Sequence, residues 1–124
     1  MTETTNSKPD RRRYDLEDRT FAFARDVREF VRRLPRTVCN IEDARQLVRA
    51  SGSVGANYIE ANESLGKKDF LMRIRISRKE AKESNYWLRL VKVGPGQEQE
   101  SQRLRLAQEA IELMRIFGAI LHKV

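Results

Sequence analysis

The chain has 124 residues, of which 40% are apolar and 35% charged, with a net charge of +7 and a sequence pI near 10.0. Length and composition predict one folded domain with a modest core, and they exclude a disordered chain. The basic balance favours an anionic partner, either nucleic acid or an acidic membrane surface, although a basic surface can also simply be solvated.

Several classes of protein are excluded by what the chain lacks. Cys39 is the single cysteine, which excludes a disulfide framework and a thiolate metal cluster. No run approaches the roughly 20 apolar residues of a membrane span, and residues 1–13 lack the apolar core of a signal peptide. We therefore expect a soluble, cytoplasmic protein with no membrane partner.

Residues 1–13 are polar and then basic, and they predict a disordered tail ahead of a helical domain spanning 14–124. The tail ends in three arginines, Arg11 to Arg13. Such a triplet is usually a solvated run of charge, and the alternative is a basic arm that contacts a phosphate backbone.

The first helix is expected from about Asp15 to Pro35, because apolar residues there alternate steps of three and four. Its stripe consists of Leu16, Thr20, Phe23, Val27, Phe30 and Leu34. Phe21, Ala24 and Val31 are expected to widen that stripe, and proline ends the helix because it disfavours helical geometry in the residue before it.

The second helix is expected to start near Asn40, which is a candidate N-cap. Its apolar stripe consists of Leu47, Ala50, Val54, Tyr58 and Ala61. Gly52 and Gly55 lie inside it at a cost of roughly 1 kcal/mol each, which indicates close approach of another backbone. The link Ser64-Leu65-Gly66 predicts a turn in which Gly66 is a left-handed cap.

Two further helices are expected, from Lys67 to about Val93 and from about Glu98 to His122, separated by the strong stop Gly94-Pro95-Gly96. Each carries two adjoining apolar seams, which is more than one neighbour covers. The fold class is therefore all-α, an antiparallel up-down-up-down four-helix bundle. The aromatic residues expected to be largely buried are Phe23, Phe30, Phe70, Trp87 and Phe117.

The residues of known enzymatic and metal sites are missing. A di-iron bundle needs Glu-x-x-His pairs, and no glutamate here is followed by histidine at that spacing. Gly52-Ser-Val-Gly55 lacks the lysine and the preceding strand of a phosphate-binding loop. His122 is near the end of the chain and Cys39 has no histidine nearby, so no nucleophile has a base. We expect no catalytic residues, metal, cofactor or small-molecule substrate.

One polar constellation spans the second and third helices. Asn57 and Glu60 share a helix face, as do Glu80 and Glu83. If the hairpin closes near Gly66, Glu60 reaches Arg73, and Asn57 meets Ser77 or Glu80. The favoured interpretation is a structural cluster that fixes helix register, and the alternative is a ligand or metal site.

A second constellation is basic and lies on the third helix. Arg75, Lys79, Lys82 and Arg89 share one line, with Arg78 adjacent and Tyr86 filling the gap. Basic residues with an interleaved aromatic suit a phosphate backbone with a base stacked on the ring. A solvated outer face of the bundle is the equally weighted alternative.

Three segments, Ser51 to Ala61, Lys67 to Phe70 and Ile76 to Leu90, resemble the bacterial four-helix bundle proteins, also called 23S rRNA intervening-sequence proteins. The resemblance is specific from Val48 to Leu90 and extends to the flanking helices in pattern only. Family members form small up-down bundles that assemble as rings of five. Some are encoded within inserted segments of rRNA genes, and a similar bundle is the accessory protein of diversity-generating retroelements, where nucleic-acid binding is implied.

The resemblance places the family's recurring asparagine and glutamate on Asn57 and Glu60, and its third-helix glutamates on Glu80 and Glu83. It supplies no catalytic residues, and it implies a homo-oligomer, with a pentamer favoured. Two functions remain open. One is non-enzymatic binding of an RNA or DNA backbone through the basic surface, and the other is a scaffold whose oligomeric surface recruits another protein.

Overall fold

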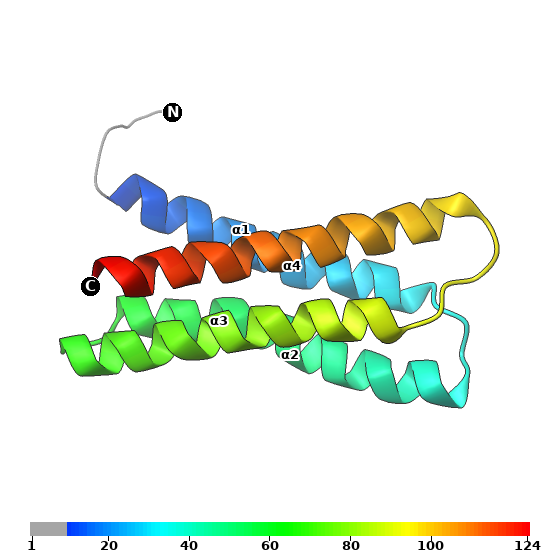
Figure 1. Ribbon diagram of the computed structural model, residues 1–124, viewed down its shortest axis with the longest axis horizontal. Helices are drawn as coiled ribbons and strands as arrows, with labels where there is room; N and C mark the ends of the chain where they lie inside the picture. Colours follow the sequence, from blue (N-terminus) through cyan, green and yellow to red (C-terminus); the bar gives the residue numbers. More distant parts are fainter. Residues whose placement is uncertain (1–9) are drawn as a thin grey trace.

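In residues 10–124, the part of the chain that the structure describes, four helices are formed (Figure 1). A computed structural model describes residues 10–124, with side chains described from residue 15 onward. The helices are α1 (Asp10–Arg32), α2 (Val38–Asn62), α3 (Lys67–Leu90) and α4 (Gln97–Lys123). Residues 10–124 contain no strand, so the predicted all-α four-helix bundle is confirmed.

The first helix begins at Asp10, five residues ahead of the expected start near Asp15. It therefore includes the backbone of Arg11 to Arg13, which the sequence had assigned to the tail. The rest of that predicted tail, residues 1–9, lies outside the described residues, and so do the side chains of the three arginines. Both interpretations of the triplet, a solvated run of charge and a basic arm on a phosphate backbone, stay predictions.

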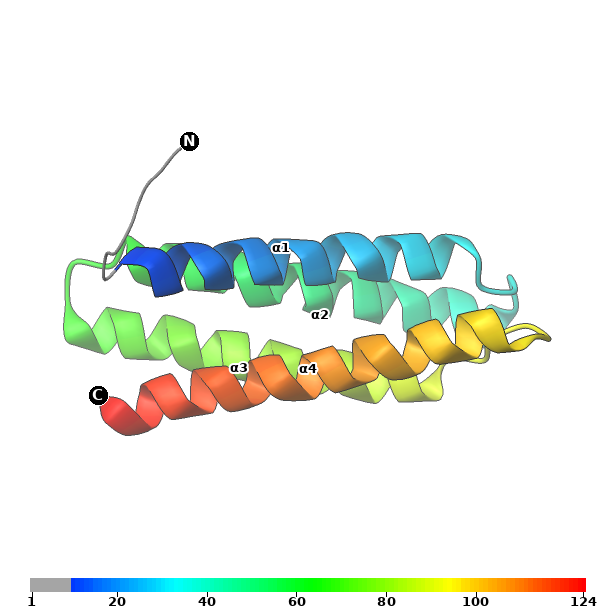
Figure 2. The ribbon, with the colours of Figure 1, turned by 90° about the horizontal axis from the view of Figure 1, so that it is seen from above.

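Successive helices run in opposite directions, and each packs against the helix before it and the helix after it, with α4 returning to α1 (Figure 2). Hydrogen bonds at the two ends of the bundle follow from these directions. Near the start of α1, Asn62 Nδ2 donates to Glu17 Oε2 over 2.9 Å from the end of α2. Near the end of α1, Gln99 Nε2 donates to the Phe30 carbonyl over 3.5 Å from the start of α4.

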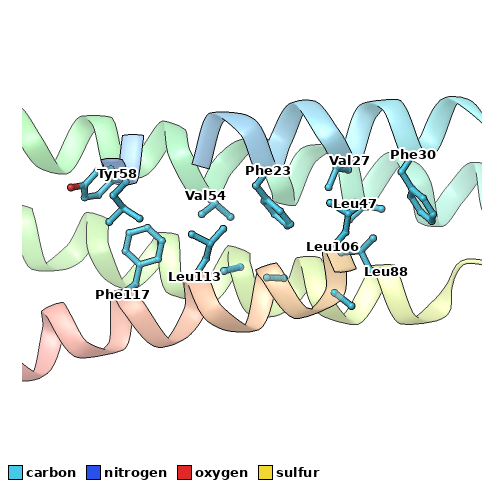
Figure 3. Packing of buried hydrophobic residues seen from close by; sticks show 14 of the residues in the cluster. Phe23, Val27, Phe30, Leu47, Val54, Tyr58, Leu88, Leu106, Leu113 and Phe117 are labelled. Atoms are coloured by element: carbon cyan, nitrogen blue, oxygen red, sulfur yellow. The ribbon is translucent and has the colours of Figure 1, made fainter. Parts of the chain in front are cut away.

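The core lies along the stripes that the sequence predicted (Figure 3). All six members of the α1 stripe and all five members of the α2 stripe are buried. Tyr58 of α2 meets Phe117 of α4, with ring centroids 5.7 Å apart. Phe23, Phe30 and Phe117 are buried as expected, whereas Phe70 and Trp87 are half-buried at the edge of the core.

One residue assigned to the α1 stripe was placed wrongly. Phe21 is 69% exposed. It precedes the buried Phe23 by two residues, and two residues on a helix of 3.6 per turn point in nearly opposite directions. Ala24 and Val31, three or four residues from stripe positions, are half-buried and do flank the core.

The cap of α2 also differs from the prediction. Thr37 is the N-cap, and its side chain accepts a hydrogen bond from Asn40 N over 3.1 Å. Asn40 is instead buried inside the first turn. Its Nδ2 donates to the carbonyls of Pro35 (2.9 Å) and Lys92 (2.8 Å), and its Oδ1 accepts from Lys92 N (2.9 Å). One side chain thus ties the α1–α2 link to the α3–α4 link.

The ends of α3 follow from its links. Gly66 is the N-cap of α3 with φ −135°, which is extended backbone, so the expected left-handed cap at this glycine is wrong. The helix ends at Leu90, three residues before Val93, because both backbone polar groups of Lys92 bind Asn40. Gly96 at the start of α4 has φ +100°, a conformation that glycine adopts without strain.

Of the two glycines inside α2 that predicted close approach of another backbone, Gly55 makes room for α1 and Gly52 does not. A Cβ built on Gly55 would lie 2.7 Å from Thr20 Oγ1 and 3.0 Å from Thr20 Cβ. A Cβ on Gly52 would lie 3.2 Å from Arg28 Nη2, at the tip of a long side chain. Only Gly55 therefore marks close approach of the main part of another helix.

Candidate nucleic-acid interface

The predicted basic line lies on the outer face of α3. Its members Arg75, Lys79, Lys82, Tyr86 and Arg89 are all exposed. The core side of the same helix is formed by Ser77, Ala81, Ser84 and Leu88, all buried. Each member of the line stands one or two residues from one of these core positions. At 3.6 residues per turn the line therefore points away from the core, and it extends about 21 Å along the helix.

Few carboxylates neutralise this face. Lys79 Nζ lies 3.9 Å from Glu83 Oε2, which is a weak exposed pair. Arg75, Lys82 and Arg89 form no ion pair within residues 15–124. Lys68, seven residues before Arg75, is exposed on the same line and also unpaired within those residues. The sequence interpretation had left Lys68 out, although the helical period would have found it.

Arg78 stands beside the line, on the side that faces α4. It is exposed, and its guanidinium lies against Gly118, where a Cβ would be 3.7 Å from Arg78 Nε. The glycine therefore leaves space for the arginine to cross from α3 onto α4. This contact brings Arg78 to the edge of the α3 surface, where its charge adds to that of Arg75 and Lys82.

The aromatic member of the line has a second ring beneath it. Tyr86 is 53% exposed, and the Tyr86 and Trp87 ring centroids lie 5.0 Å apart with an interplanar angle of 79°. Trp87 is half-buried and packs against the core. An edge-to-face pair of this kind is a favourable arrangement of two aromatic rings, and it favours this orientation of the outer ring.

The predicted polar cluster forms two separate groups rather than one. In the first, Asn57 Nδ2 donates to the Ser53 carbonyl over 2.9 Å, and its Oδ1 accepts from Arg73 Nη1 over 3.1 Å. The expected pair between Glu60 and Arg73 is wrong. Glu60 is exposed, and its carboxylate forms no ion pair within residues 15–124. The register of α3 places Arg73 beside Asn57 instead.

The second group joins Glu80 and Glu83 through an arginine of α2 that the sequence interpretation missed. Arg49 Nη1 lies 3.5 Å from Glu80 Oε2, and Arg49 Nη2 lies 3.4 Å from Glu83 Oε1. The Glu80 side chain is only 8% exposed, and its Oε1 has no hydrogen-bond partner within residues 15–124. Ser77 takes no part in this group, because its Oγ donates to the Val54 carbonyl over 2.8 Å.

A groove of about 550 Å³ lies between α1 and α4, and the sequence interpretation did not anticipate it. Arg19 bridges it, with Nε 2.7 Å from Glu109 Oε2 and Nη2 2.9 Å from Glu112 Oε1. The hydrogen bond to Glu109 raises the pKa of Arg19 above its usual value, with a smaller contribution from Glu112. The bridge ties the first half of α1 to α4, and its one cation between two carboxylates leaves a net charge of −1 there.

Among the side chains that the structure describes, no three histidine, cysteine, aspartate or glutamate residues are grouped to hold a metal ion. Cys39 is exposed, at the start of α2. None of the helices in the described part of the chain is long and apolar enough to cross a membrane.

Comparison with known proteins identifies the family. The model of the 23S rRNA-intervening sequence protein family matches residues 12–118. The chain belongs to this family. The match extends over all four helices, beyond the segment from Val48 to Leu90 that carried the resemblance in the sequence.

A solved structure similar to this family member is a protein with unknown function from the S23 ribosomal protein family of Bacteroides thetaiotaomicron. The two share 23% identity with a TM-score of 0.72, over 86% of this chain and 97% of that chain. At this identity the likeness shows the shared bundle fold alone. A comparison with curated proteins found no match.

Proposed function

We propose that this protein binds the phosphate backbone of RNA or DNA through the basic face of α3. The observation that carries the proposal is the line of exposed cations on that helix. Among the side chains of residues 15–124, only Lys79 of this line lies within ion-pair distance of a carboxylate. A cation that has no protein partner is free to replace a counterion on a phosphate, which is the main source of backbone affinity.

The distribution of charge on α3 strengthens this proposal. The carboxylates of Glu80 and Glu83 are turned toward Arg49 of α2, and the cations face outward. Helix α3 carries eight lysine or arginine residues and three aspartate or glutamate residues, so its own charge is +5 in a chain of net charge +7. Backbone contacts carry no sequence information, so we expect recognition of shape and charge with weak base specificity.

We also propose that the chain forms a homo-oligomer, with a pentamer favoured and a cytoplasmic location expected. Apolar surface that one bundle leaves uncovered supports an assembly. Leu104 of α4 is 54% exposed, and Leu90 at the end of α3 is 45% exposed. Light scattering at micromolar concentration tests this proposal, and a monomer would contradict it.

The function is tested by the salt dependence of RNA and DNA binding. One variant replaces Arg75, Lys79, Lys82 and Arg89 with alanine. For the wild type, affinity should fall steeply with salt. A plot of the logarithm of the binding constant against the logarithm of salt concentration should have a slope of about −0.7 to −0.9 per phosphate contacted. The four-site variant should bind more weakly, with a slope shallower by up to about 3 units.

A matched control removes four exposed arginines that lie outside α3, in α1, in α2 or in the link between them, and that are each paired with a carboxylate. They are Arg25, Arg32, Arg33 and Arg45. Both variants lower the net charge by four, so a difference between them reports position rather than total charge. Equal loss in both variants would contradict a site on α3. Salt-insensitive binding, or none near 50 mM salt, where backbone contacts are strong, would instead favour the scaffold that recruits a protein.

A further inference from the structure

The aromatic pair on α3 stands inside the proposed phosphate track. Tyr86 follows Lys82 by four residues and precedes Arg89 by three, so the ring has a cation within about 6 Å of helix rise on either side. Its neighbours along the face, Arg75 and Lys79, are also exposed. A strand that follows these cations must pass over the ring of Tyr86.

This ring is both accessible and held in place. Its 53% exposure leaves much of the side chain to solvent, and its edge-to-face contact with Trp87 favours one orientation of the ring. Trp87 in turn is packed against the hydrophobic core. Little side-chain entropy is therefore left to lose when a flat ligand group lies on Tyr86.

The geometry fits unpaired nucleotides better than a duplex. In a duplex the faces of the bases are stacked on one another, so that a protein surface meets phosphates, sugars and base edges. A single strand offers base faces that stack on an aromatic ring while its phosphates follow neighbouring cations. Every base has such a face, so stacking adds affinity without reading sequence.

We infer that Tyr86 is a stacking platform that makes the α3 surface a site for single-stranded nucleic acid, in preference to duplex. This inference rests on the proposed function and specifies its ligand class. Tyr86 supplies the stacking contact, Trp87 positions its ring, and the adjacent cations hold the phosphates. The same chemistry suits a single-stranded RNA, a single-stranded DNA or an unpaired loop.

The test compares an unstructured 20-nucleotide oligouridine with a 20-base-pair RNA duplex at one salt concentration. Tyr86→Ala should weaken oligouridine binding by about 5- to 160-fold, which corresponds to the 1 to 3 kcal/mol typical of replacing one stacking aromatic with alanine. Duplex binding should change less than about twofold, and both salt slopes should stay the same, because no cation is removed. Tyr86→Phe is the matched control, which keeps the ring and should bind like the wild type.

A second measurement is independent of any variant. Trp87 is the only tryptophan of the chain and touches the proposed platform. Its fluorescence should change when oligouridine saturates the wild-type protein, and should stay constant when the duplex does. This readout holds even if Tyr86→Ala alters the stability of the fold, which thermal melting of that variant would reveal.

The outcomes separate the two proposals. Suppose that binding depends on salt, and that Tyr86→Ala leaves it unchanged or weakens it equally for oligouridine and duplex. That result would overturn the stacking inference, while the proposed backbone binding would stand. A fluorescence change with both ligands would also overturn the preference for single strands. Failure of the wild type to bind either ligand near 50 mM salt would overturn the proposed function and this inference with it.

Discussion

The contact between Gly55 and Thr20 gives the sharpest test of how the bundle is packed. Alanine at position 55 would place its Cβ 2.7 Å from Thr20 Oγ1 and 3.0 Å from Thr20 Cβ. Thr20 is 1% exposed, and its Oγ1 is tied to the Glu17 carbonyl over 3.0 Å. Neither helix can absorb the overlap by turning one flexible side chain, so α1 and α2 must separate.

The magnitude follows from a comparison with Gly52, three residues earlier on the same helix. Glycine to alanine gains about 1 kcal/mol of helix propensity at either position. At Gly52 the new Cβ would meet Arg28 Nη2 at 3.2 Å, and that guanidinium tip moves at little cost. At Gly55 overpacking costs about 1 to 3 kcal/mol. Because the propensity gain cancels, Gly55→Ala should be less stable than Gly52→Ala by about 1 to 3 kcal/mol.

Thermal or chemical unfolding measures this difference. Both variants are compared at one fixed protein concentration, because the stability of the proposed homo-oligomer would depend on concentration. For a chain of 124 residues, each kcal/mol shifts Tm by about 4 °C. Thr20→Ala in the Gly55→Ala background removes the shortest contact and should recover part of the loss. If the Gly55→Ala variant were at least as stable as the Gly52→Ala variant, the argument that α1 and α2 meet at Gly55 would be refuted.

Two further stability predictions follow from single side chains. Asn40→Ala leaves three backbone groups of the two links without their hydrogen-bond partner. It should lower the free energy of unfolding, measured with denaturant, by about 2 to 4 kcal/mol. A loss below about 1 kcal/mol would contradict the role of Asn40 in joining the links. Glu80→Met removes a buried charge with an unpaired oxygen and should leave stability unchanged or raise it by about 1 kcal/mol. Arg49→Met leaves the buried Glu80 without its partner and should lower stability by about 1 to 3 kcal/mol. This is less than the usual cost of breaking a buried ion pair, because Arg49 is half-exposed. If Glu80→Met proved less stable than Arg49→Met, this account would be contradicted.

The bundle was predictable because its core depends on a local period. Steps of three and four place Leu16, Phe23 and Phe30 on one side of α1 wherever the neighbouring helices lie. Helix ends were less predictable, because tertiary bonds decide them. Nothing near Val93 in the sequence indicates that α3 ends at Leu90, since the cause is Asn40, which is 52 residues away from Lys92.

The candidate site also has one part that could be predicted from the sequence and one part that could not. The line of cations on α3 needs only the helical period, and the structure places all of its members on one exposed face. The partners of the polar groups needed the register between α2 and α3. The sequence estimate placed the turn near Gly66, whereas the helices end at Asn62 and resume at Lys67, with the midpoint nearer Leu65. That change shifts the residues of α3 that lie opposite α2 by about one helical turn. Arg73 therefore donates a hydrogen bond to Asn57 instead of pairing with Glu60.

The two sides of α3 explain why net charge alone would have been a poor guide to this surface. Glu80 and Glu83 are spaced to face α2, where Arg49 binds both, so that two carboxylates of a highly charged helix are used between helices. Cations three and four residues apart occupy the opposite side of the helix. Among the carboxylates that the structure describes, only that of Glu83 lies within ion-pair distance of this line. Packing thus separates charges that the sequence interleaves. A backbone-binding surface on this helix depends on that separation, and so on the register that Arg49 helps to fix.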